Sequence, residues 1–143
     1  MRLADYAERL IGLARTVYAW AAEAAETDGR KREKIALYAE EIAATLARAA
    51  GAMAALEQRP ENRLALLAAS RELGRISGYV ETLMSALEGR LDGRKRAGVK
   101  RRLEGLEPFE LEPALGDANA FRQARKFASA EGYFRALADA LRA

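Results

Sequence analysis

Residues 66–87, LLAASRELGRISGYVETLMSAL, decide the fold class of this chain. Apolar or small residues recur there at alternating intervals of three and four, which is the spacing of one continuous stripe along an α-helix. The stripe consists of Leu66, Ala69, Leu73, Ile76, Val80, Leu83 and Leu87. Such a narrow stripe is typical of a helix that packs lengthwise against other helices.

Other segments carry the same alternation, so the sequence predicts an all-α fold, an antiparallel helical bundle of four to five helices, three of them long. Its 143 residues suit a single domain, 1–143. The expected helices cover residues 3–26, 30–57, 61–88, 94–106 and 118–142. Within 61–88, Gly74 and Gly78 lie four residues apart and indicate the close approach of a neighbouring helix.

The composition argues against an enzyme. The chain contains no histidine and no cysteine, which removes the commonest general base, the commonest zinc ligand and thiolate chemistry. No phosphate-binding glycine-rich loop with its lysine and no nucleophile-elbow motif is present. Carboxylates such as Glu40, Glu41, Glu72 and Glu81 are interpreted as ordinary exposed residues, with Arg75 as a helical neighbour of Glu72. We therefore expect no catalytic residues, no metal site and no cofactor.

The basic residues gather in two places, both candidates for a surface that binds an anionic partner. Residues 58–106 hold the basic excess, whereas residues 1–57 and 107–143 are each slightly acidic. The candidate residues are Arg94, Lys95, Arg96, Lys100, Arg101 and Arg102 in the first cluster, and Arg30, Lys31, Arg32 and Lys34 in the second. The first cluster either faces solvent or pairs with Glu107, Glu110 and Glu112, and the sequence leaves both arrangements open.

The predicted first helix is a candidate membrane-active element. Its apolar stripe, interpreted first as core, consists of Leu3, Tyr6, Leu10, Leu13, Val17 and Trp20. The acids Asp5 and Glu8 are unlike a secretory signal, and no apolar run reaches the roughly 18–20 residues of a spanning helix. We therefore expect a cytoplasmic protein, recruited to a membrane only if this helix acts there.

Three stretches together resemble a known family. They are RKREKIALYAEEIAATLARAAGAMAAL, LALLAASRELGRISGYVETLMSAL and KRRLEGLEPFELEPALGDANAF. Their order is similar to the N-terminal four-helix bundles of cell-death effectors, which include mixed-lineage kinase-like proteins, fungal HeLo domains and the N-terminal domains of plant helper immune receptors. The resemblance covers about residues 30–121 and implies a latent bundle that oligomerises and disrupts membranes. The first helix departs from it, because Gly12 is its one glycine and Arg9 and Arg15 interrupt it.

Three hypotheses for function follow. The leading one is a non-enzymatic protein-interaction or adaptor module that binds a protein partner or a second copy of itself. The first alternative is a HeLo-like cell-death bundle that binds and disrupts anionic membranes. The second is nucleic-acid binding through the basic segment 90–102, which is the weaker hypothesis because no aromatic residue lies among the basic ones to stack on a base. No small-molecule substrate is indicated.

Overall fold

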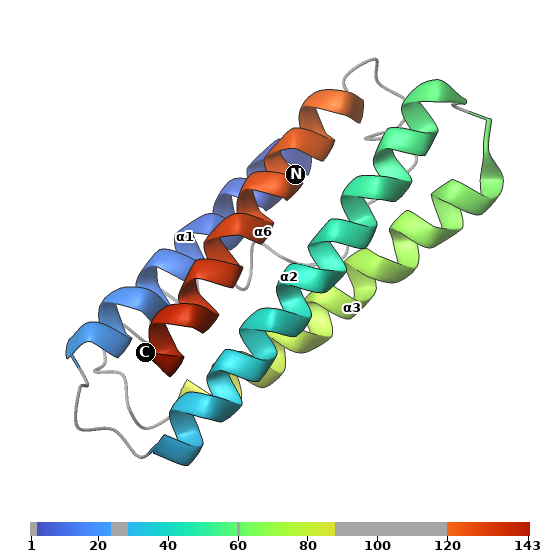
Figure 1. Ribbon diagram of the computed structural model, residues 1–143. Helices are drawn as coiled ribbons and strands as arrows, with labels where there is room; N and C mark the ends of the chain where they lie inside the picture. The colour runs from blue at the N-terminus through green and yellow to red at the C-terminus, as the bar shows by residue number, and fades with distance from the viewer. Residues whose placement is uncertain (1–2, 24–28, 60, 88–119) are drawn as a thin grey trace.

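Every regular element in the described part of the chain is an α-helix. The computed structural model describes residues 3–23, 29–59, 61–87 and 120–143, without the side chains of 3–7, 19–23, 31, 77, 84, 86–87 and 120–123. The helices are α1 (Leu3–Glu23), α2 (Gly29–Gln58), α3 (Arg63–Leu87) and α6 (Ala120–Arg142). They lie side by side with similar axis directions in an elongated bundle (Figure 1). The all-α bundle is confirmed, while the helix predicted at 94–106 lies outside the described residues.

The helices are arranged around α2. This helix packs extensively against α6 and against α3, and α6 packs in turn against α1 (Figure 1). Both neighbours of α2 run antiparallel to it, as predicted. In contrast, α1 and α6 run parallel. Glu8 contacts Lys126 and Arg15 contacts Tyr133, and in both contacts the two residues are 118 positions apart, as parallel helices require. The last described helix, α6, has 23 residues and is also long, since its length lies between the 21 residues of α1 and the 25 of α3.

The core follows the predicted stripes. Because α2 lies between two neighbours, it buries a wider face than a single stripe, and the small side chains of its many alanines allow close packing on both sides. On α6, Phe127 and Phe134 are fully buried and fill the space between α1 and α2. Most of the core residues are Leu10, Leu13, Ala14, Val17, Ile35, Ala36, Ala39, Ile42, Ala43, Leu46, Ala49, Met53, Leu56, Ala69, Leu73, Ile76, Val80, Leu83, Phe127, Ala130, Phe134, Leu137 and Leu141.

Asn62 sets the start of α3. Its side-chain Oδ1 accepts a hydrogen bond from the backbone N–H of Ala65 at 3.1 Å, which is the geometry of a helix N-cap. The predicted start at residue 61, with Pro60 in the first turn, is therefore two residues too early.

Candidate interaction surface

The predicted membrane-active helix is part of the core. Leu10, Leu13 and Val17 are fully buried in α1, while the side chains of Leu3, Tyr6 and Trp20 lie outside the described residues. Polar contacts also tie the outer edge of α1 to α6. Lys126 Nζ donates to Glu8 Oε1 at 2.7 Å, and the Arg15 guanidinium donates to the Tyr133 hydroxyl at 2.8 Å while lying 5.1 Å above its ring. These contacts hold α1 in the bundle.

The basic cluster at the start of α2 lies beside the C-terminal end of α6. Arg32 is half-buried, and its Nε donates to the backbone carbonyl of Leu141 at 3.3 Å. Cations are unfavourable at the start of their own helix, but the unpaired carbonyls at the end of an antiparallel neighbour attract them. Arg32 therefore has an internal role. Arg30 and Lys34 are exposed, and the side chain of Lys31 lies outside the described residues.

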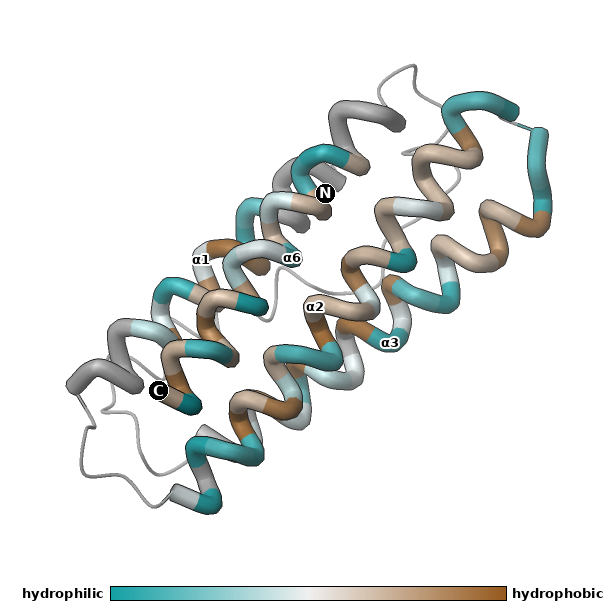
Figure 2. Tube along the Cα trace, viewed as in Figure 1, coloured by the Kyte–Doolittle hydropathy of each residue, from teal (hydrophilic) through white to brown (hydrophobic). Residues whose placement is uncertain are grey.

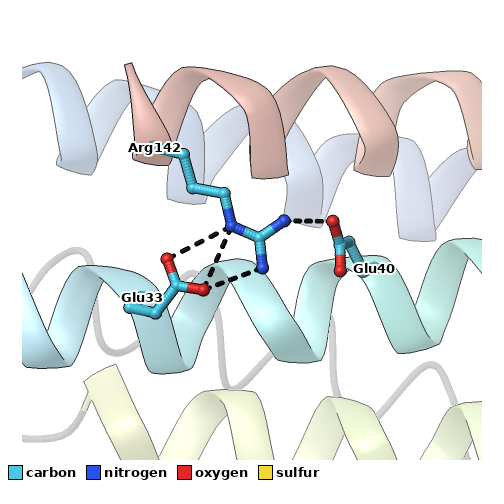
Figure 3. A network of polar contacts seen from close by, with 3 residues as sticks. All are labelled: Glu33, Glu40 and Arg142. Carbon is cyan, nitrogen blue, oxygen red and sulfur yellow. Dashed lines mark hydrogen bonds and ion pairs between the residues drawn. The ribbon is translucent and has the colours of Figure 1, made fainter.

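Acidic residues of α2 complete a network at the same end of the bundle. Arg142 Nη2 donates to Glu33 Oε1 at 2.9 Å, and Nη1 of the same side chain donates to Glu40 (Figure 3). The hydrogen bonds to Glu33, and to a lesser extent to Glu40, raise the pKa of Arg142 above its ordinary value, so the guanidinium stays charged. Because Glu33 and Glu40 are interleaved with the basic residues, this surface is mixed in charge.

The other predicted anionic-partner residues lie outside the described part of the chain. These are Arg94, Lys95, Arg96, Lys100, Arg101 and Arg102, together with the acids Glu107, Glu110 and Glu112. Whether these two groups pair with each other stays open.

Glu72 corrects one expectation about α3. Only 7% of this residue is exposed, and its Oε2 accepts a hydrogen bond from Arg48 Nε at 3.0 Å. Arg48 Nη2 also donates to the buried Thr45 hydroxyl at 3.1 Å. The prediction that Glu72 is exposed is wrong, because its position beside the apolar stripe faces α2, although Glu72 remains a helical neighbour of Arg75. The charge-assisted pair fixes α3 to α2 in one register.

Among the described residues, none covers the opposite side of α3. A second stripe at intervals of three and four runs along it, and we call this stripe the α3 outer face. It consists of Leu64, Leu67, Arg71, Gly74, Gly78, Glu81 and Ser85, all of them exposed. Leu64 is 79% exposed and Leu67 is 59% exposed, which makes them the two most exposed large apolar side chains in the described part of the chain. Figure 2 shows hydrophobic residues where α3 begins.

The glycine pair on the α3 outer face has no close neighbour. A Cβ atom added at Gly74 or Gly78 would meet no atom within 4 Å. The sequence predicts a closely packed neighbour at these positions, and no atom of the described residues fills that place. Glycine in the middle of a helix is destabilising relative to alanine, and packing among residues 3–23, 29–59, 61–87 and 120–143 gives no reason for either glycine.

Charged residues frame the glycine pair. Arg71 lies on the N-terminal side of the pair and Glu81 on the C-terminal side, and the described residues include no ion-pair partner for either. About 15 Å of helix separates the two, at 1.5 Å per residue, so they do not pair with each other. The sequence signal for this surface is the second stripe itself. It is easily overlooked because it mixes two leucines, an arginine, two glycines, a glutamate and a serine.

The rest of the described structure offers no competing site. No group of three or more His, Cys, Asp or Glu side chains there is placed to hold a metal ion, and none of the described helices is both long and apolar enough to cross a membrane. The remaining large exposed apolar residues, Tyr18, Leu37 and Tyr133, lie on other helices. Comparisons with protein-family models, curated proteins and solved structures found no match to this chain.

Proposed function

We propose that this chain is a non-enzymatic protein-interaction module that binds through the α3 outer face. The observation that carries the proposal is the pair of exposed leucines, Leu64 and Leu67, on a helix whose opposite side is fully used in the core. A single exposed leucine is ordinary, but two at a spacing of three lie side by side and form an apolar contact. The same stripe continues with charges of both signs, which supply specificity in an interface.

The geometry suits a helical partner. A straight helix face with small residues at its centre accepts a second helix along its length, whereas a small molecule requires a concave site. Glu72 and the core stripe hold α3 rigidly on α2, so the face is preorganised and little conformational entropy is lost on binding.

Site-specific photocrosslinking in the cells that produce the protein tests this proposal. A photoreactive amino acid replaces Leu67, and a matched control places it at Ala136, which is exposed on α6. We expect a discrete covalent adduct from position 67 and none of the same size from position 136. Adducts from neither position, or the same adducts from both, would contradict the proposal.

The membrane alternative needs a second conformation of the chain. Leu10, Leu13 and Val17 face α6, so α1 reaches a bilayer only after it separates from α6 and loses the contacts of Glu8 and Arg15. Leakage of anionic vesicles that disappears when residues 1–26 are removed would favour this alternative over the interaction module. The hypothesis of nucleic-acid binding predicts instead a steep fall of affinity with salt, by about 0.9 in log units per phosphate contact on duplex DNA.

A further inference from the structure

We infer that the partner of the α3 outer face is a second copy of this chain, docked antiparallel so that Arg71 of each copy lies opposite Glu81 of the other. This inference rests on the proposed function and names the partner. It is carried by the charge pattern of the face, in which Arg71 and Glu81 lie on the two sides of the glycine pair.

The α3 outer face is self-complementary about one point. Arg71 and Glu81 are equidistant from residue 76, and so are Gly74 and Gly78. Two copies related by a two-fold axis at that point therefore place each arginine against a glutamate and each Gly74 against a Gly78. A two-fold interface uses the same patch on both subunits, and it requires this kind of symmetry in the patch.

The opposite orientation is unfavourable. Two parallel copies in register would place Arg71 against Arg71 and Glu81 against Glu81, and like charges in contact repel. The antiparallel arrangement replaces both repulsions by two ion pairs. Charge complementarity therefore selects one orientation and one register.

The glycine pair allows the close approach that this docking needs. With no side chain at Gly74 or Gly78, the two helices meet backbone to backbone at the centre of the face. Nothing in the described part of the chain occupies the space above these residues. Leu67 then lies opposite Ser85 of the other copy, so the bulkiest residues of the stripe flank the centre without colliding there.

Other partners match the face less well. The stripe holds one basic and one acidic residue, so it offers no net charge to an anionic lipid surface, to a nucleic acid or to an acidic peptide. For binding to an unrelated helix, Arg71 and Glu81 would not need to lie at equal distances from the glycine pair. In a second copy the arginine and the glutamate meet in complementary positions.

Charge exchange in the purified full-length chain tests the inference. We measure the dimer dissociation constant by sedimentation velocity for the wild type, Arg71→Glu, Glu81→Arg and the double variant. Each single variant should dimerise about tenfold more weakly than the wild type, because two exposed ion pairs become two like-charge contacts. The double variant should recover wild-type affinity, since it restores both pairs with the charges exchanged.

Mixing the two single variants provides a stricter test. In a mixed dimer of Arg71→Glu with Glu81→Arg, both contacts again join opposite charges. We therefore expect the mixture to associate more tightly than either variant alone, and the difference to shrink in high salt. Helix content by circular dichroism confirms that each variant folds.

Gly74→Ala and Gly78→Ala probe the close approach. Each should weaken dimerisation severalfold, because a methyl group separates the helices at their nearest point. Gly51→Ala on α2 and Gly132→Ala on α6 are matched controls, since both glycines are exposed with nothing within 4 Å of an added Cβ. The controls should leave the dissociation constant unchanged.

Several outcomes would overturn the inference. These are a wild-type chain that stays monomeric over the whole concentration range, single charge variants that dimerise normally, or a double variant that fails to recover. Failure here is separable from failure of the proposed function. If the crosslink from position 67 joins a different protein, the interaction module stands and the self-association falls; if no crosslink forms, both fall.

Discussion

The helices α3 and α6 both pack on α2, but they use their surfaces differently. α6 lies between α1 and α2 and buries two phenylalanines, Phe127 and Phe134, in a core shared by three helices. Among the described helices, α3 packs extensively on α2 alone, and its buried apolar side chains are all aliphatic. One stripe of α3 therefore makes its contacts with the described helices, while its second stripe is exposed.

Phe134→Ala on α6 should produce the largest loss of stability among the substitutions that compare α6 with α3. Deletion of a fully buried aromatic ring leaves a cavity among three helices, so the free energy of unfolding should fall by about 3–5 kcal/mol. Urea denaturation followed by circular dichroism measures it. Leu67→Ala on α3 is the matched change on the exposed stripe and should shift stability by less than about 0.5 kcal/mol. A large loss from Leu67→Ala would show that the outer face is structural.

Glu72→Gln should have the next largest effect and distinguishes the two faces of α3. It removes the charge from the pair with Arg48, and we expect a loss of about 1 kcal/mol, because Arg48 is 44% exposed and water partly replaces the contact. The same substitution at exposed Glu81 is the control and should leave monomer stability unchanged. Both are measured at protein concentrations low enough to exclude dimers. Equal losses at the two positions would contradict the assigned faces.

Gly74→Ala should stabilise the monomer while it weakens the dimer. Alanine restricts the unfolded chain and favours the helix, so the free energy of unfolding should rise by about 0.4–1 kcal/mol, as it should for Gly132→Ala on α6. Thermal denaturation of dilute samples measures this gain. Both substitutions should raise the stability of the monomer, but only Gly74→Ala should also weaken dimerisation. A destabilised Gly74→Ala monomer would indicate an unseen close contact within the chain.

Arg142→Gln should have the smallest effect, confined to one end of α6. The substitution removes the ion pairs with Glu33 and Glu40, all of them exposed, so global stability should hardly change. Hydrogen exchange should become faster for amides in the last turn of α6 and stay unchanged in α3. Faster exchange along the whole of α6 would instead mean that this network helps to dock the entire helix.

The sequence was sufficient to predict helices and their buried stripes. Leu73, Ile76 and Phe134 all face the core as the alternation of three and four requires. Periodicity reports which side of one helix is apolar, so it succeeds wherever a single stripe decides the packing. It carries no information on which helices become neighbours, and the parallel pairing of α1 with α6 therefore had no signal in the sequence.

Individual polar residues were harder to assign. Glu72 looks like any surface glutamate in the sequence, and only the position of Arg48 on the neighbouring helix explains its burial. The sequence predicts Arg32 as part of a surface for an anionic partner, whereas its contact is the carbonyl of Leu141 at the end of another helix. In both cases the partner is more than 20 residues away along the chain. Such pairings depend on the register between helices, which one sequence does not specify.

The parallel pairing of α1 with α6 also has a consequence for how this chain folds. α2 and α3 are joined by a short connection over residues 59–62, so their contacts are local and close a small loop. The contact between Glu8 and Lys126 instead joins residues 118 positions apart. A contact between residues so far apart costs more loop-closure entropy, and contacts of large sequence separation form late and slow the folding of a chain. We therefore expect the α2–α3 hairpin to form first, and the joining of the first and last helices to limit the folding rate.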